Sequence, residues 1–440
     1  MDSVEAVAAR SSLAMVAVRL LLLPAGLAVA VILAKYLGAS ILGTYSLVAT
    51  LAVVVLPLSA MGFGTGAFFY ISRDSYPLGA VLGTSLFCGV LHGVIALVVL
   101  AVLYWSGALG SAGELLDVDH TILILAYFPL LGVNLVLLDI LLALGMVTQF
   151  NAMVLIRALF QLFLIFLFVA WYDWGLQGAL LGSLLAASIG SSVALISLRS
   201  ALADCRLDFN FLSSSYSYGM KSWLGVFYSK LHLRVGQLFL APFVSAAEMG
   251  NFFLAAKIAE QPLLIAEAVT PVFSRILARQ NELSSRVRIA ETLHRLIFWA
   301  TMAICVACGL VLYSVDHLLV RDYSDLVGVA SMLLVGSAVY VSGKVLNDFF
   351  MATGLPSVSG VIGVSSLVLA TAFYLVFVPA FGLYGGVIAV LLSNVFRSFV
   401  CVLYFNRESG GAGFSLYSFR VSDVLWAIKV FRSILVGKRE

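Results

Sequence analysis

The sequence predicts an all-α polytopic membrane protein with about twelve transmembrane helices, arranged as two six-helix bundles related by a pseudo-two-fold axis along the membrane normal. Three observations predict this fold class. Of the 440 residues, 62% are hydrophobic and only 11% are charged, whereas a soluble domain carries about 25% charged residues. Apolar runs long enough to span a bilayer follow one another along the chain, and segments of the first half return in the second half.

The apolar runs define the expected helices, because a spanning helix needs about 20 predominantly apolar residues. Such runs lie near 13–35, 42–72, 79–105, 120–143, 150–172, 175–199, 220–243, 251–275, 292–314, 326–351, 357–379 and 384–405. Pro57, Pro262 and Pro271 should kink or break their helices, since proline lacks the backbone N–H and clashes with the preceding turn. The polar start, MDSVEAVAARSS, is unlike a signal peptide, so the first run should stay as a membrane helix.

Three pairs of segments recur in the same order in the two halves of the chain. They are LGASILGTYSL (37–47) with VSAAEMGNFFL (244–254), WGLQGALLGSLL (174–185) with FGLYGGVIAVLL (381–392), and ALGMVTQFNAM (143–153) with ATGLPSVSGVI (352–362). The first two pairs share an offset of 207 residues and the third has an offset of 209. Each copy holds an even number of expected helices, so both copies face the same way and the axis relating them should follow the membrane normal.

The repeat also predicts the domain organisation. We expect an N-terminal bundle over residues 1–200, a cytoplasmic linker over 201–221, a C-terminal bundle over 222–406 and a cytoplasmic tail over 407–440. In the tail, Val424, Leu425, Ile428, Phe431 and Leu435 share one face of an amphipathic helix that could lie along the inner leaflet or act as a passive anchor. Two like bundles around one cleft can rock and open it to each side in turn, which is alternating access.

The positively charged loop residues predict the orientation. Nearly all of the loop and tail cations, including Arg73, Arg206 and Arg295, fall on one side of this arrangement, whereas the other side holds only Lys35 and Arg321. By the positive-inside rule, both termini should lie in the cytoplasm.

Charged side chains inside the apolar runs are the candidate functional groups, since each costs about 2.5–3.5 kcal/mol at the centre of a spanning helix. The cations are Arg19, Arg157, Lys230, Arg234, Lys257, Lys344 and Arg397, and the acids are Asp139, Glu260, Glu267 and Asp348. The excess of cations favours an anionic cargo such as a phosphate group. For several of these residues an ion pair with a neighbour on the same helix, such as Lys257 with Glu260, is the competing interpretation.

Other classes of function find little support. The sequence contains no Walker A motif, no HExxH and no GxSxG in a strand–turn–helix setting, so we expect neither an enzyme nor an ATP-driven pump. Cys305 and Cys308 have no second cysteine pair or histidine cluster beside them, which predicts no metal site, and no cofactor is expected. The formal net charge of +3 is too small to indicate a nucleic-acid partner. His92 and His232 are expected to be hydrogen-bonded packing residues rather than a proton relay.

Much of the chain resembles a known family. YLGASILGTYSL (36–47), GFGTGAFFYISR (62–73), the segment from Arg234 to Arg279 and FVPAFGLYGGVIAVLLSNVFRSFVCVLY (377–404) resemble Wzx-type polysaccharide flippases. These belong to the multidrug/oligosaccharidyl-lipid/polysaccharide (MOP) exporter superfamily of MATE-like fold, and the resemblance covers about 13–405. One departure is Gly236, where such relatives often carry aspartate.

The resemblance implies a flippase that moves an undecaprenyl-diphosphate-linked oligosaccharide from the inner to the outer leaflet of a bacterial cytoplasmic (inner) membrane, for polysaccharide, O-antigen or exopolysaccharide biosynthesis. Its implied partners are the lipid-linked oligosaccharide, membrane lipids and other polysaccharide-assembly proteins. The alternative within the superfamily is a MATE-type antiporter of drugs or organic cations, whose cleft should be lined by acids.

Under the flippase hypothesis, the intramembrane charges receive expected roles. Lys230 and Arg234, four residues apart and therefore on one face of a continuous helix, would engage the diphosphate together with Arg19. Lys257 and Arg397 would contribute from the second bundle, and Arg157 is a further expected cleft cation. The acids Glu260, Glu267 and Asp139 are candidates for proton or ion coupling.

Overall fold

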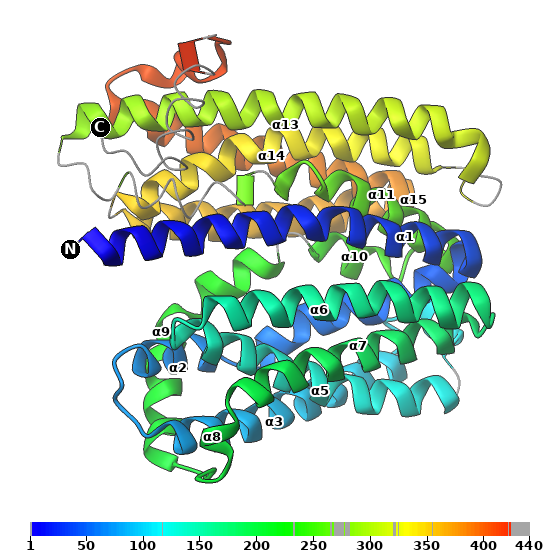
Figure 1. The fold of residues 1–440 in the computed structure, drawn as a ribbon. Helices are drawn as coiled ribbons and strands as arrows, with labels where there is room; N and C mark the ends of the chain where they lie inside the picture. The colour runs from blue at the N-terminus through cyan, green and yellow to red at the C-terminus, as the bar shows by residue number, and fades with distance from the viewer. Residues whose placement is uncertain are drawn as a thin grey trace.

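The protein is helical throughout the part of the chain that the computed structural model describes. The described residues are 2–116, 118–231, 234–264, 266–267, 277, 282–319, 323, 325–353, 355–420 and 422–423. All elements assigned within these ranges are helices, and Figure 1 shows them as two lobes, one above the other, with the helices running roughly parallel. The predicted all-α fold class is confirmed.

The first lobe and its connection hold the elements up to residue 231. They are α1 (Asp2–Ser59), α2 (Phe63–Ile71), α3 (Leu78–Trp105), α4 (Gly110–Glu114), α5 (Val118–Ala143), α6 (Val147–Ile165), the π-helical η1 (Phe166–Trp171), α7 (Gly175–Ser197), α8 (Arg199–Leu202) and α9 (Phe209–Leu231). The second lobe contains α10 (Val235–Leu240), α11 (Ala246–Glu260), α13 (Leu283–Leu319), α14 (Leu326–Ala352), α15 (Pro356–Ser409) and the 3₁₀ helix η2 (Ala412–Tyr417).

Two of the longest helices each make two crossings. Helix α1 reverses at Gly38 (φ 71°, ψ 169°) and α15 reverses at Gly382 (φ 54°, ψ −128°), backbone conformations that lie outside the helical region. Eight helices in the described ranges are long and apolar enough to cross a membrane by length and composition.

One pair of equivalent glycines in the repeat shares an unusual backbone φ. Gly175 and Gly382, matched at the 207-residue offset, both have a positive φ, at 52° and 54° respectively. Glycine is favoured at both places because side chains rarely adopt this left-handed region. The repeat seen in the sequence is therefore present in the backbone.

The two copies also touch each other symmetrically. A methyl group at Gly43 would lie 1.9 Å from the Ala246 carbonyl oxygen, and a methyl group at Gly250 would lie 2.0 Å from the Ala39 carbonyl oxygen. Because Ala39 matches Ala246 and Gly43 matches Gly250 in the repeat, the contact is reciprocal, as a two-fold axis requires. Only residues as small as glycine allow α1 and α11 to approach this closely.

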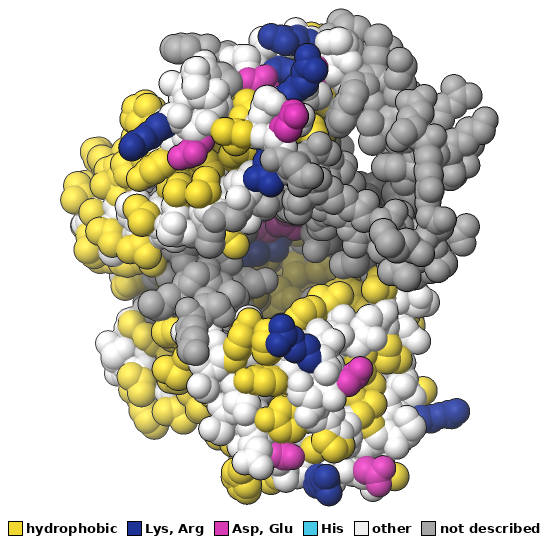
Figure 2. Space-filling model, turned by 90° about the vertical axis from the view of Figure 1, so that its left-hand side faces the viewer, with side chains coloured by type: hydrophobic (Ala, Val, Ile, Leu, Met, Phe, Trp, Pro, Cys, Tyr) yellow, Lys and Arg dark blue, Asp and Glu magenta, His cyan; other side chains and the backbone are white. Residues whose placement is uncertain are grey.

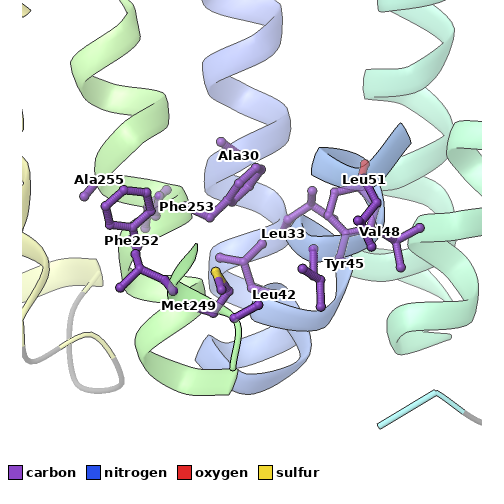
Figure 3. Close-up of a cluster of buried hydrophobic side chains, with 14 of the residues drawn as sticks. Ala30, Leu33, Leu42, Tyr45, Val48, Leu51, Met249, Phe252, Phe253 and Ala255 are labelled. Carbon is purple, nitrogen blue, oxygen red and sulfur yellow. The ribbon is translucent and has the colours of Figure 1, made fainter. Parts of the chain in front are cut away.

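A buried apolar cluster surrounds this crossing. Figure 3 shows Leu33, Leu42 and Tyr45 of α1 lying against Met249 and Phe253 of α11, and all five side chains are buried. Further contacts join the lobes on the same side of the molecule: the Tyr323 hydroxyl donates to the Ala34 carbonyl at 2.8 Å, and a methyl at Gly110 would lie 2.2 Å from the Ala241 carbonyl oxygen. We call this side, which holds the Gly38 and Gly382 reversals, the sealed side, and the side where α1 begins and α15 ends the terminal side (Figure 1).

The segment predicted to be a linker is partly helical. Its second half forms the start of α9, which lies against α2 of the first lobe so closely that a methyl at Gly219 would be 2.0 Å from the Gly62 carbonyl oxygen. Helix α9 begins at Phe209 and α13 begins at Leu283, both before the apolar runs that predicted them, because each starts with polar and charged residues that hydropathy does not register.

Arg295 was counted among the loop cations, and that assignment is wrong. It lies inside α13, where its Nε donates to Asp423 Oδ2 at 2.6 Å, and its side chain is 4% exposed. The neighbouring His294 is hydrogen-bonded to the Leu416 carbonyl at 3.0 Å and to Ser342 Oγ at 2.9 Å. These contacts hold the chain after α15 against α13 and α14. The predicted amphipathic helix from Val424 onward lies outside the described residues.

Replacing Asp423 with asparagine should destabilise the second lobe by about 1–3 kcal/mol, because the buried Arg295 guanidinium loses the carboxylate 2.6 Å away and keeps that of Glu291 at 3.7 Å. Thermal unfolding of the purified protein in detergent measures the loss. The double variant Arg295→Met with Asp423→Leu removes both charges and should recover most of the stability. Equal instability of the single and double variants would contradict a role for this ion pair.

Candidate functional site

A cavity of about 750 Å³ lies between the two lobes. Its wall includes residues of α1, α5 and α6 from the first lobe, and Arg234 with residues of α11 from the second lobe. Figure 2, which views the molecule from the terminal side, shows a hollow between the two lobes with basic and acidic side chains at depth. Since α1 and α11 pack together on the sealed side, the cavity opens toward the terminal side.

Arg234 enters the cavity at a break in the seventh span. Helix α9 ends at Leu231, Arg234 stands in a turn with φ −119° and ψ −12°, and α10 begins at Val235. The structure does not describe the side chain of Lys230, so the expectation that Lys230 and Arg234 share one helix face stays a prediction. Non-helical backbone at membrane depth is tolerated where it lines a cavity, and this break lies at one.

The eighth span is also interrupted at the cavity. Helix α11 ends at Glu260, two residues before Pro262, because proline cannot donate the backbone hydrogen bond that the next turn needs. The predicted break at Pro262 is thus confirmed, while Pro271 lies outside the described residues. The interruption leaves Glu260 at the end of the helix, where its side chain reaches the chain that carries Arg234.

Glu260 holds two cations together at the cavity wall. Its Oε1 accepts from Arg234 Nη1 at 2.8 Å, and its Oε2 accepts from Lys257 Nζ at 3.1 Å. The side chains of Arg234, Lys257 and Glu260 are 16%, 30% and 24% exposed, so the cluster faces the cavity and remains accessible. The three residues line the cavity together with Glu267 and Gln261. We call Arg234, Lys257 and Glu260 the ion cluster.

The first lobe presents a different polar surface to the same cavity. Arg157 Nη1 donates to Asn134 Oδ1 at 2.6 Å, and Asn134 Nδ2 in turn donates to Ser191 Oγ at 3.2 Å. Arg157 is therefore held by neutral hydrogen-bond acceptors in these contacts. Tyr45 and Gln161 line the cavity nearby, and both are hydrogen-bonded to Ser183, at 3.0 and 3.5 Å.

Several cavity residues were not found from the sequence. Tyr45, Tyr127, Thr50 and Gln161 all line the cavity, and Thr50 Oγ1 donates to Gln237 Oε1 across the two lobes. They carry no charge, so the search for ionised groups in apolar runs passed over them. A search for uncharged polar side chains at matching depth in several runs could have found them.

Other charges predicted for the cleft lie elsewhere. Arg397 is 7% exposed inside the second lobe, with its guanidinium 5.1 Å from the centre of the Tyr340 ring, and it is not among the residues lining the cavity. Asp139 is also absent from that lining and lies beside Gly64 of α2. Both placements correct the expectation that these residues face the cleft. The side chains of Arg19 and Lys230 lie outside the described part of the chain.

An intrahelical ion pair and a histidine in the interior of the first lobe lie away from the cavity. Lys344 and Asp348 form an ion pair at 3.0 Å within α14, away from the cavity. His92 Nε2 is hydrogen-bonded to the Tyr216 hydroxyl at 2.7 Å and packs against Phe63, so it serves the interior of the first lobe. Within the described residues no group of three or more His, Cys, Asp or Glu side chains could hold a metal ion.

Comparison with known proteins identifies the fold. No family model matches the chain, and no curated protein matches it either. The solved inward-facing structure of a multidrug resistance MATE family transporter of the MOP superfamily matches with a TM-score of 0.70 and 20% identity, over 90% of this chain and 98% of that chain. The corresponding outward-facing structure matches with a TM-score of 0.61 and 20% identity, over 91% and 95%.

A third solved structure is a MOP superfamily transporter from Pyrococcus furiosus Vc1 (DSM3638), whose description states that the reverse polarity of its binding pocket suggests a different function. It matches with a TM-score of 0.60 and 20% identity, over 92% of this chain and 95% of that chain. At such identities the similarity shows the MATE-like, twelve-span, two-lobe fold.

Proposed function

We propose that the chain is an alternating-access transporter of a phosphate-bearing lipid, specifically a flippase that moves a polyprenyl-diphosphate-linked oligosaccharide between the leaflets of a bacterial inner membrane. The observation that carries the proposal is the chemistry of the cavity wall. Among the described residues the wall carries three cations, Arg157, Arg234 and Lys257, and two acids, Glu260 and Glu267. Glu260 is paired with two of these cations in the ion cluster. Arginine and lysine at such positions suit oxyanions, and arginine can bind a phosphate with two parallel hydrogen bonds.

The shape of the cavity supports the same cargo. Its volume of about 750 Å³ is within the range of roughly 300–1,000 Å³ typical of sites for drug-sized molecules, which gives room for a diphosphate and adjoining sugar rings. Hydroxyl and amide groups from Tyr45, Thr50 and Gln161 face the cations across the cavity and can hydrogen-bond sugar hydroxyls. The polyprenyl tail would remain in the bilayer.

Under this proposal the terminal side faces the cytoplasm, and the membrane potential drives export. One elementary charge crossing 100 mV gains about 2.3 kcal/mol, so a diphosphate bridge with about two negative charges gains roughly 4–5 kcal/mol on moving outward from an inside-negative cell. Neither a proton nor a metal ion has to move in the opposite direction. Lipids, and the proteins that extend the exported glycan, are the partners this function implies.

A drug or organic-cation antiporter is the second candidate, because the fold accommodates it equally and two acids, Glu260 and Glu267, line the cavity. The geometry favours it less. A lipophilic cation would have to compete with Arg234 and Lys257 for Glu260, at a cluster whose formal charge is positive.

Binding and transport by the full chain in proteoliposomes separate the two candidates. We expect the protein to bind a polyprenyl-diphosphate-linked oligosaccharide, to bind tetraphenylphosphonium weakly or not at all, and to flip the labelled lipid faster when an inside-negative potential is imposed with potassium and valinomycin. A polyprenyl-linked sugar without phosphate is the matched control cargo. Strong binding of tetraphenylphosphonium with none of the diphospho-lipid would reverse the assignment.

A further inference from the structure

Glu260 lies between two spaces. It lines the central cavity, and it also lines a second, smaller cavity of about 70 Å³ whose described wall residues belong to the second lobe. Ser337, Tyr340 and Asn394 of α14 and α15 contribute polar groups to the wall of this second cavity. The Glu260 side chain therefore has polar surroundings on both sides of α11.

Arg234 and Lys257 are already paired with an anionic group of the protein itself, the Glu260 carboxylate. Arg234 donates to both oxygens of the Glu260 carboxylate, at 2.8 and 3.4 Å, and Lys257 donates to Oε2 at 3.1 Å. A phosphate oxygen pair of the cargo would need the same donors, since charge-assisted hydrogen bonds from arginine and lysine are what recognises it. Cargo and carboxylate cannot both occupy this position.

We infer that Glu260 is a specificity-determining residue that occupies the anion site of the empty cavity and must be displaced by the cargo. The inference rests on the proposed function and names how that site selects its substrate. A single-charge anion offers the cations no more than Glu260 does and must also lose its translational freedom, whereas the carboxylate is tethered to α11. A diphosphate brings more charge and more acceptor oxygens, so it wins the competition and monoanions are excluded.

The second cavity gives the displaced carboxylate a destination. Asn394 carries two amide N–H groups, of which one donates to the Gly336 carbonyl at 3.1 Å, while the Ser337 hydroxyl on the same wall donates to the Ala259 carbonyl at 2.7 Å. Behind them, the guanidinium of Arg397 lies 5.1 Å from the Tyr340 ring centre. A carboxylate turning away from the central cavity would therefore meet the amide of Asn394 rather than a purely apolar wall.

The test is Glu260→Gln in the full chain, with inorganic diphosphate and acetate as probes in nanodiscs. Loss of the internal carboxylate should tighten diphosphate binding about tenfold or more, as the removal of a competing charged hydrogen bond implies, and should make acetate binding measurable. Glu267→Gln is the matched control, since it removes the same charge from the same cavity and leaves the ion cluster intact. Unchanged or weaker diphosphate binding by Glu260→Gln would overturn the inference, as would an equal gain in Glu267→Gln.

A purely structural ion pair makes a different prediction, namely lower thermal stability with no gain in anion affinity. If Glu260→Gln fails to fold, Glu260→Asp takes its place: it retains the charge but is one methylene too short to reach both cations, so an intermediate gain is expected. Wild-type flipping of the diphospho-lipid with no change in anion selectivity in either variant would refute the role of Glu260 alone. Absence of diphospho-lipid binding in the wild type, together with a gain of diphosphate binding in Glu260→Gln, would refute only the flippase proposal.

Discussion

Replacing Arg234 with alanine is expected to weaken binding of the diphospho-lipid by at least about 30-fold and to stop flipping, since truncating one partner of a partly buried charged pair costs about 2–5 kcal/mol. The substitution acts twice. It removes a donor for the phosphate, and it leaves Glu260 with Lys257 as its partner in the ion cluster, so the formal charge of that cluster falls from positive to zero. Isothermal titration of the purified protein with the diphospho-lipid measures the loss.

Two companion variants make this result specific. Arg234→Lys retains the charge but not the two parallel hydrogen bonds, and it should bind with intermediate affinity. Arg199→Ala removes an exposed cation of α8 that does not line the cavity, and it should leave binding unchanged. Diphospho-lipid affinity that is insensitive to Arg234→Ala would contradict the assignment of the ion cluster as the anion site.

Replacing Gly43 with valine should prevent the sealed side from closing. The first added carbon alone would lie 1.9 Å from the Ala246 carbonyl oxygen, so α1 and α11 would have to separate by more than an ångström. Overpacking of this kind costs about 1–3 kcal/mol or more, and here both neighbours are backbone atoms that cannot turn aside. The state with a closed sealed side should lose population, and transport should stop because alternating access needs both states.

Labelling of a reporter cysteine measures this opening. Leu42→Cys, introduced after the five native cysteines have been replaced, is buried beside the crossing and should react slowly with an impermeant maleimide while Gly43 is present. With Gly43→Val the reaction should accelerate. Gly309→Val is the control, because a methyl group at Gly309 of α13 would meet nothing within 4 Å. Equal labelling rates in both valine variants would show that the glycine crossing does not form the seal.

The sequence could predict the crossings because hydropathy is a property of contiguous residues. The expected ends of helices were less accurate where a helix continues beyond the apolar run, as α13 does through its polar first turns at Leu283 to Arg288. The sequence repeat also predicted how the two halves are related, which hydropathy alone does not. The match of Gly43 with Gly250 already contained the two-fold relation, and the backbone conformations of Gly175 and Gly382 show how closely equivalent positions agree.

The candidate site was only partly predictable, because pattern reasoning assumes that a helix continues. Helix α11, for example, ends at Glu260 ahead of Pro262, and this end places the Glu260 carboxylate against Arg234. Arg397 and Lys257 look alike in the sequence, as single cations in apolar runs. In the structure Lys257 faces the central cavity, while Arg397 stacks over Tyr340 inside the second lobe.

By itself the sequence determined a membrane protein of two like-oriented halves with more cations than acids in its spans, since composition, periodicity and repetition are all written along the chain. Only the tertiary structure decided which charges meet. Arg234 and Glu260 are 26 residues apart and come together because one helix is interrupted before Val235 and the other ends ahead of Pro262. The net charge that a cavity presents depends on ion pairs between residues that are distant in the sequence, and counting charges along the chain does not reveal these pairs.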